Sequence, residues 1–289
     1  MNNTSGLIDP LLIVIVLYNT TLSNSESYQS ISNGFKSYAS ESRLVDLMVI
    51  NNGPLSIDCY ADDSIFRLHF IEQLDNPGVS RAYNLAAKVA SSLQKRWLLL
   101  LDQDTHLPND FLIHYSQSVD HFPSAPVHAP RLYAGAILAS PCGYRYYRGY
   151  VLSNLDQGIY KMQGRNVLNS GLLVAVDAFL RVGGYDEAVG LYFSDFVFFD
   201  RLKSIYTMFA VVNVDLQHDL SSSDYSSRQT AVNRFSMYCK GAYAAGKHDL
   251  LRNVLYFFTI GARSLLMNYR FKTWAFTKNF LQIWFFQYK

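Results

Sequence analysis

The chain has 289 residues, enough for one large α/β domain or two ordinary ones at about 150 residues per domain. Hydrophobic residues make up 49% of it and charged residues 17%, a balance that excludes intrinsic disorder. Because 25 Lys and Arg residues face 23 Asp and Glu residues, the net charge of +2 gives no basic field of the kind that binds nucleic acid. We therefore expect no nucleic-acid partner.

The cysteines and the N-terminal segment indicate the compartment. Cys59, Cys142 and Cys239 are odd in number and far apart, which predicts neither a disulfide framework nor a zinc cluster. The apolar run at 11–18 is shorter than the about 20 residues of a membrane-spanning helix, and no basic segment precedes it. We expect no export and a reducing, cytoplasmic location.

The first part of the chain alternates between apolar runs and amphipathic segments. Apolar runs rich in Val, Leu and Ile predict buried strands at 11–18, 45–50, 66–71 and 97–101. Apolar residues at helical spacing predict helices over 21–42 and 79–93. Strands that alternate with helices indicate βαβ units and a doubly wound α/β sheet, which binds ligands at the carboxyl ends of its strands.

The later part is less regular. Its pattern predicts strands at 144–152, 167–176 and 206–216, a short helix at 177–182, and helices over 228–247 and 250–289. The last segment has no acidic residue, six Lys or Arg residues and many aromatics, Trp274 and Trp284 among them. Such a helical segment is typical of a membrane interface, but the same side chains also fit packing on the α/β domain or on a partner subunit.

Two carboxylates, Asp102 and Asp104, follow the most apolar predicted strand directly. Because residues i and i+2 of a strand project to the same side, we expect both to face one ligand. Paired carboxylate oxygens suit Mg²⁺ or Mn²⁺ held together with a diphosphate, and the metal then neutralises charge on a departing phosphate. The alternative is that the pair caps the next helix, near Leu107.

The order of several short blocks resembles the inverting glycosyltransferases of family 2, over about residues 10 to 220. The blocks are Ile15-Val-Leu-Tyr-Asn19, Val49-Ile-Asn-Asn-Gly53, Asn76-Pro-Gly78 through Asn84, Asp102-Gln-Asp104, Asn169-Ser-Gly171 with Gly183-Gly-Tyr-Asp-Glu187, and Ser194-Asp195 with Arg201. This resemblance implies the GT-A fold, a Rossmann-like mixed sheet, here with a helical, aromatic and basic C-terminal extension. It also implies transfer of a sugar from a nucleotide-diphosphate donor.

The resemblance implies a catalytic base and a metal site. The base is Asp195, which lies in an aromatic segment where desolvation raises the pKa of a carboxylate. The family's flanking carboxylates are Ser194 and Val197 here, and the alternative for Asp195 is a helix N-cap. The implied ligands of Mn²⁺ or Mg²⁺ are Asp104, Asp102 and His218. As an isolated residue, His218 would be ordinary, and its place after the strand at 206–216 carries the assignment.

The resemblance also implies a nucleotide-sugar donor of the dTDP or UDP type. The residues expected to bind it are Asn19, Asn51, Arg81, Asn84, Asp102 and Gln103. Asn51 stands where the family often has an Asp that accepts the pyrimidine N3–H, and an amide oxygen accepts such a bond too. Arg81 and Asn84 open a helix whose N-terminus favours phosphate, the alternative being a solvated helix face. Ser170 and Gly171 are the expected acceptor-side residues.

The details are most similar to the rhamnosyltransferase-type branch, which builds bacterial O-antigen lipopolysaccharide and other surface polysaccharides. The implied acceptor is a polyprenyl-diphosphate-linked saccharide, met by a peripheral protein at the inner face of the cytoplasmic membrane. We expect a catalytic domain over 1–220, with a nucleotide-sugar half at about 10–105 and an acceptor half at about 106–220, and a membrane- or partner-associating region over 221–289.

Two other functions compete with this hypothesis. A non-catalytic, sugar-nucleotide-binding scaffold of a polysaccharide assembly complex is suggested by the two missing carboxylates beside Asp195. A Rossmann-type oxidoreductase fits the alternating first half, but no Gly-x-Gly-x-x-Gly follows the first strand.

Overall fold

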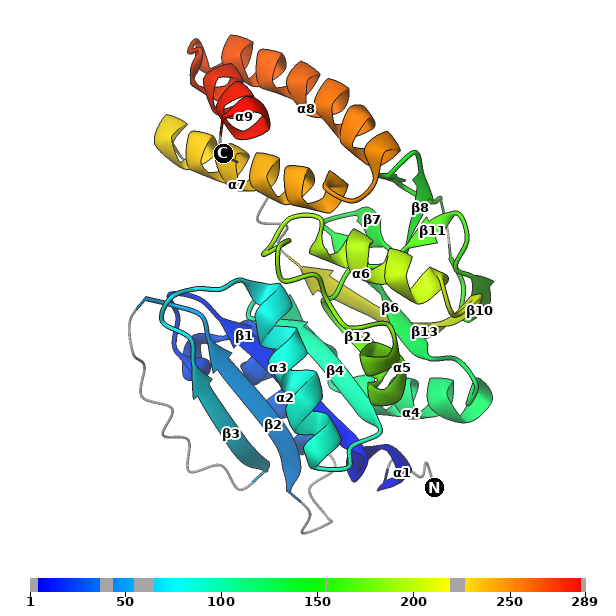
Figure 1. Cartoon of the computed structure of the whole chain (residues 1–289). Coiled ribbons are helices and arrows are strands. Elements are labelled where there is room, and N and C mark those ends of the chain that lie inside the picture. The colour runs from blue at the N-terminus through cyan, green and yellow to red at the C-terminus, as the bar shows by residue number, and fades with distance from the viewer. Residues whose placement is uncertain (1–4, 37–43, 55–64, 154, 219–226, 287–289) are drawn as a thin grey trace.

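The computed structural model describes residues 5–36, 44–54, 65–153, 155–218 and 227–286 (Figure 1). The helices are α1 (Ser5–Ile8), α2 (Glu26–Lys36), α3 (Val79–Ser92), α4 (Phe111–His121), α5 (Val176–Arg181), α6 (Ser194–Lys203), α7 (Arg228–Gly246), α8 (Leu250–Phe271) and α9 (Ala275–Phe285), with a short 3₁₀ turn at Leu22–Asn24. The strands are β1 (Leu11–Leu17), β2 (Val45–Asn51), β3 (Phe66–Glu72), β4 (Trp97–Asp102), β5 (Thr105–His106), β6 (Val127–Ala134), β7 (Ile137–Ser140), β8 (Cys142–Arg145), β9 (Arg148–Tyr150), β10 (Gly158–Lys161), β11 (Arg165–Asn166), β12 (Leu172–Ala175) and β13 (Met208–His218).

The main sheet is mixed, with the order β10-β13-β6-β12-β4-β1-β2-β3. The four strands β4, β1, β2 and β3 are parallel, as the alternating first part of the sequence predicts. β12 is antiparallel to both β4 and β6, which makes the second half of the sheet mixed. A small separate sheet has the order β11-β8-β9.

Helices cover both faces of the main sheet. In β1, Leu12, Val14 and Val16 belong to the apolar cluster that α3, α5 and α6 cover, whereas the alternate residues of the strand belong to the cluster under α2 and α4 (Figure 1). Because both faces are covered, the strand is apolar at every position, which is the signature of a buried parallel strand. Because β1, β2 and β4 are parallel, their carboxyl ends meet at one edge of the sheet.

The other predicted strands shift by one or two residues at an end, and the strand predicted at 206–216 is β13, but two predictions differ more from the structure. The segment at 144–152 is not one strand but a hairpin of β8 and β9, because Tyr146 and Tyr147 adopt left-handed backbone with φ of 50° and 58° and reverse the chain. The segment at 167–176 pairs only over Leu172–Ala175. Gly171, with φ of 80°, bends the preceding residues away from the sheet.

The C-terminal helices α7, α8 and α9 enclose an apolar cluster of their own and lie together at one end of the molecule (Figure 1). Tyr147 and Phe193 of the α/β part pack against this cluster, and Arg252 of α8 pairs with Asp200 of α6 at 2.6 Å. Among the described residues, no helix has the length and apolar character needed to cross a membrane. The predicted domain boundary at 220/221 lies outside the described residues.

Candidate active site at the carboxyl edge of the sheet

The carboxylate of Asp102, at the end of β4, is held by donors from two elements. Tyr83 of α3 donates its hydroxyl to Oδ1 at 2.9 Å, and Asn169 donates Nδ2 to the same oxygen at 3.1 Å. Ser170 donates its hydroxyl to Oδ2. Burial and the charge of Asp102 hold the pKa of the Tyr83 hydroxyl well above its ordinary value, so this group remains a donor. The carboxylate is thus fixed in one orientation.

The turn after Asp102 is attached to the segment that follows β1. Gln103 accepts the backbone N–H of Tyr18 on Oε1 at 2.7 Å, and its own carbonyl accepts the Ser25 hydroxyl at 2.9 Å. Ser27 donates its hydroxyl to the carbonyls of Asp102 and Thr105. These bonds fix the turn at the ends of β1 and β4.

Asp104 lies on this turn rather than on a strand. Because β4 ends at Asp102, the alternation of strand side chains does not extend to Asp104, and the two carboxylates are not related in the way the sequence pattern assumes. The backbone of His218 pairs with Thr105, so the end of β13 runs beside the residue that follows Asp104. The alternative of a helix cap is excluded, because the N-cap position of α4 is Asp110.

Asp195 lies in the first turn of α6. The residue at the N-cap position is Phe193, in left-handed conformation with φ of 72°, so Asp195 is not the helix cap that the alternative assumed. Burial raises the pKa of the Asp195 carboxyl to about 7, with a further contribution from the charge of Asp102. The Ser194 hydroxyl, 3.3 Å from Asp195 Oδ1, opposes this rise in pKa.

Tyr185 packs in the aromatic core beside Tyr83, the residue whose hydroxyl is bonded to Asp102. Its ring stacks on Phe198 of α6 at 4.2 Å and contacts Tyr83 at 5.4 Å. Burial and the charges of Asp195 and Asp102 raise the pKa of its hydroxyl well above the ordinary value. This hydroxyl is buried without a hydrogen-bond partner among the described residues, and the charges of both carboxylates act on it.

Several of the residues expected to bind the nucleotide lie at the same edge. The side chains of two of them, Asn51 and Asn84, are already hydrogen-bonded to backbone groups of the protein. Asn51 is 1% exposed and accepts the backbone N–H of Gly53 on Oδ1 at 2.9 Å. Asn84 bridges to the backbone N–H and carbonyl of Tyr185, at 2.8 and 3.0 Å. Asn19, at φ of 55°, and Arg81 are both exposed. Their roles towards a nucleotide stay predictions.

The two acceptor-side residues differ in position. Ser170 belongs to the group around Asp102. Gly171 is a backbone element: its φ is 80°, its carbonyl accepts the Tyr115 hydroxyl at 2.5 Å, and an added Cβ would collide with Leu216 and Pro130. Only glycine fits this place, so the conformation of the loop before β12 depends on it.

Sequence reasoning did not assign a site role to Tyr83, Asn169 or Tyr185. All three were visible in the motifs, since Asn169 precedes Ser170 and Tyr185 follows two glycines. The signal that identifies them is a polar atom on an otherwise buried residue, because such an atom needs a partner. Only the structure shows that Tyr83 and Asn169 find their partner in Asp102, whereas the Tyr185 hydroxyl has none among the described residues.

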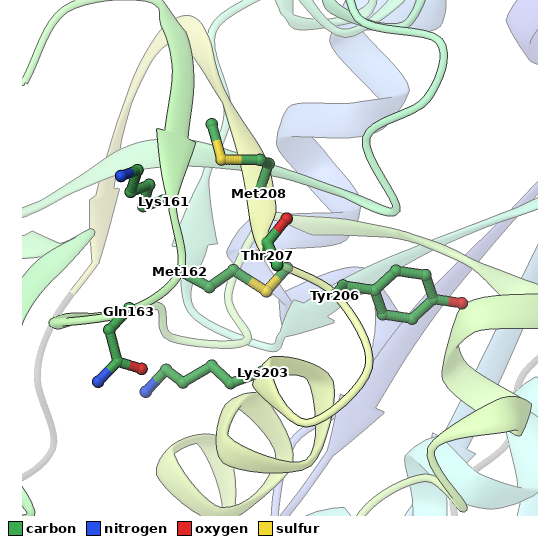
Figure 2. Close-up of a pocket in the computed structure, with 7 residues that line it drawn as sticks. All are labelled: Lys161, Met162, Gln163, Lys203, Tyr206, Thr207 and Met208. Carbon is green, nitrogen blue, oxygen red and sulfur yellow. The ribbon is translucent and has the colours of Figure 1, made fainter.

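A hollow of about 340 Å³, shown in Figure 2, lies beside Lys203, the last residue of α6, whereas Asp195 is in the first turn of that helix. It is lined by Lys161, Met162, Gln163, Lys203, Tyr206, Thr207 and Met208. Lys203 is already paired with Asp200 at 2.8 Å. We therefore assign the site to the sheet edge, where the carboxylates lie, and not to this hollow.

The residues near the turn form no complete set of metal ligands in the described part of the chain. Among the side chains that the structure describes, no three His, Cys, Asp or Glu residues are grouped closely enough to hold a metal ion. The side chain of His218 is not part of that description. The backbone of His218 pairs with Thr105, the residue after Asp104, and the role of Asp104, Asp102 and His218 as metal ligands stays a prediction.

No protein-family model and no curated protein matches this sequence. Solved structures do resemble it. TarS 1–349 of S. aureus in complex with UDP-GlcNAc aligns with a TM-score of 0.53 at 10% identity, over 94% of this chain and 90% of that one. Another structure of S. aureus TarS 1–349 gives a TM-score of 0.51 at 8% identity, over 94% of this chain and 89% of that one. GalNAc-T7 with UDP, GalNAc and Mn²⁺ gives 0.57 at 11% identity, over 94% and 56%.

These likenesses establish the class of fold. The chain has the GT-A glycosyltransferase fold, a mixed α/β sheet with C-terminal helices added, and the predicted fold is confirmed.

Proposed function

We propose that this protein is an inverting glycosyltransferase that moves a hexose from a UDP- or dTDP-linked donor to a saccharide hydroxyl. The observation that carries the proposal is the position of Asp195 and the raised pKa of its carboxyl. Asp195 is a carboxylate at the start of α6 whose pKa is raised to about 7 by burial and by Asp102. A general base works best when its pKa lies near the operating pH.

In the proposed reaction, ionised Asp195 accepts the proton of the acceptor hydroxyl. The hydroxyl oxygen attacks C1 of the donor sugar while the bond from C1 to the diphosphate breaks. The nucleoside diphosphate leaves with the bonding electrons, and the new glycosidic bond has the inverted configuration. One carboxylate is sufficient for this step, because the proton and the leaving group are on opposite faces of the sugar.

The turn at Asp102 would receive the donor diphosphate. Asp104 and His218, with Asp102 beside them, would hold Mn²⁺ or Mg²⁺, which neutralises charge on the leaving diphosphate when bound. The role we assign to Asp102 is to orient this edge, because three donors fix its carboxylate. Its charge also keeps the pKa of Asp195 raised.

The acceptor in this proposal is a polyprenyl-diphosphate-linked saccharide at the inner face of the cytoplasmic membrane. The motif resemblance supports it, and so does the basic, aromatic C-terminal region. The same resemblance to the rhamnosyltransferase-type branch makes O-antigen or another surface polysaccharide the proposed product and rhamnose the proposed sugar.

Thermal stabilisation by UDP, dTDP, GDP and CMP, each with and without Mn²⁺, tests the donor site. A ligand that binds only the native state increases the free energy of unfolding, by about 2.7 kcal/mol when its concentration is 100 times its Kd. The melting temperature rises as a result. We expect a Mn²⁺-dependent rise with UDP or dTDP that Asp104→Asn reduces. No rise with any nucleotide would refute the donor site.

An assay for release of the nucleoside diphosphate from the donor then distinguishes an active glycosyltransferase from a non-catalytic scaffold. The expected result is slow donor hydrolysis by the native protein and none by Asp195→Asn, with nucleotide binding unchanged in both. Tight nucleotide binding without turnover in the presence of any acceptor would instead identify a scaffold.

A further inference from the structure

The outer side of α8 has an apolar stripe that no part of the described structure covers. Its members are 42–88% exposed and, apart from the adjacent pair at 265 and 266, are separated by three, four or seven residues: Leu251, Val254, Phe258, Leu265, Leu266 and Tyr269. This spacing places them along one face of the helix. α8 has 22 residues and is about 33 Å long. The stripe, from Leu251 to Tyr269, extends along most of this length.

The opposite side of α8 is the one that the fold uses. Tyr256, Ile260 and Met267 are buried against α7 and α9, and Arg252 is buried against α6. The exposed stripe therefore adds nothing to the packing of the helical layer. A contiguous apolar face that is exposed to solvent marks an interaction site.

The charges around the stripe indicate its partner. Trp274, Phe285 and Phe286, which follow α8 in the chain, are also exposed, at 75%, 61% and 78%. Lys272, at the end of α8, and Lys278 of α9 are also exposed. From 250 to 289 the sequence has no acidic residue. Aromatic side chains next to lysines, without any acid, are complementary to the headgroup region of an anionic membrane.

We propose that α8 and α9 lie flat on an anionic lipid surface, with the stripe in the headgroup and acyl boundary and the lysines against the lipid phosphates. The inner side of the same layer contacts the segment that precedes Asp195, because Phe193 packs on Tyr238 at 4.8 Å and on Tyr256 at 4.9 Å. The candidate site would then lie beside the membrane. This deepens the proposed function and rests on it only for the lipid-linked acceptor.

The test is co-flotation of the full chain with phosphatidylcholine vesicles, with and without phosphatidylglycerol. The stripe variant is the double substitution Phe258→Glu and Leu265→Glu. The matched control is Leu180→Glu with Ile205→Glu, two apolar residues of 41% and 47% exposure outside the C-terminal helices. A third variant, Lys272→Gln with Lys278→Gln, isolates the charge.

We expect the native protein and the control to bind anionic vesicles, and the stripe variant to bind at least about tenfold more weakly. The lysine variant should lose its preference for phosphatidylglycerol, and salt should weaken native binding. Unchanged melting temperatures and nucleotide binding would show that the variants are folded and that the donor site is intact, so vesicle binding is read independently of activity.

Two results would overturn the proposal. One is that the native protein does not float with either vesicle. The other is a dimer that the stripe variant converts to a monomer without any effect on vesicle binding, since the stripe would then be a contact between copies of the chain.

Discussion

Replacing Asp195 by Asn should change the pH dependence of stability as well as activity. The folded protein holds the pKa of this carboxyl at about 7, against 3.8 in the unfolded chain. Between these values the folded state binds a proton that the unfolded state releases, so the stability of the native protein falls as pH rises through this window. The Asn variant has no such proton and should not show this fall.

The size of the effect follows from the shift. At 1.36 kcal/mol per pKa unit, the rise from 3.8 to about 7 corresponds to at most about 4 kcal/mol. Between pH 5.5 and 8.5 only the upper part of the window is crossed, so the loss in the native protein should be about 2 kcal/mol more than in Asp195→Asn. At pH 8.5 the variant should therefore be the more stable protein.

Urea unfolding at pH 5.5 and 8.5, without nucleotide or metal, measures this difference. Asp120→Asn, on the exposed side of α4, is the control for a carboxylate in water and should follow the native protein. Equal losses for the native protein and Asp195→Asn would refute the argument that Asp195 is desolvated. The same pKa predicts that donor hydrolysis increases with pH to a plateau, with its midpoint near 7.

Further predictions concern the support of the site. Tyr83→Phe removes a hydroxyl bonded to the Asp102 carboxylate and should lower the free energy of unfolding by about 2 kcal/mol in urea titration. Tyr185→Phe removes a buried hydroxyl without a partner among the described residues. It should leave stability unchanged or raised, so a loss equal to that of Tyr83→Phe would contradict this account. Arg252→Met breaks the pair with Asp200 and should cost about 1 kcal/mol by the same measurement, because the partly exposed Asp200 carboxylate loses one partner but keeps Lys203. No loss of stability would mean that α6 does not depend on α8.

The parallel half of the fold could be predicted from the sequence because its signal is local. Continuous apolar runs such as Leu11–Leu17 have no other simple explanation than a strand buried on both faces. The hairpin of β8 and β9 could not be predicted in this way, because it depends on left-handed backbone at Tyr146 and Tyr147. Tyrosine gives no sequence signal for that conformation, unlike glycine or asparagine.

The candidate site could be predicted only in part. The sequence identified the polar residues that end the strands, and the structure brings Asp102, Ser170 and Asp195 together. It could not reveal that Asn84 is bonded to the backbone of Tyr185, nor that Asp104 has left the strand. These facts depend on contacts between residues far apart in the chain, which periodicity does not encode.

The C-terminal helices α7 and α8 contact α6, the helix that carries the candidate base Asp195, near both of its ends. At its start, Phe193 is held between Tyr238 and Tyr256, and Gly241 lies so close that an added Cβ would be 2.5 Å from the Tyr192 carbonyl. Near its end, Asp200 is paired with Arg252. Because both ends of the helix that holds Asp195 rest on α7 and α8, a shift of this layer must also move the carboxylate. A lipid surface that fixed α8 would therefore fix the position of Asp195 relative to an acceptor held in the same surface.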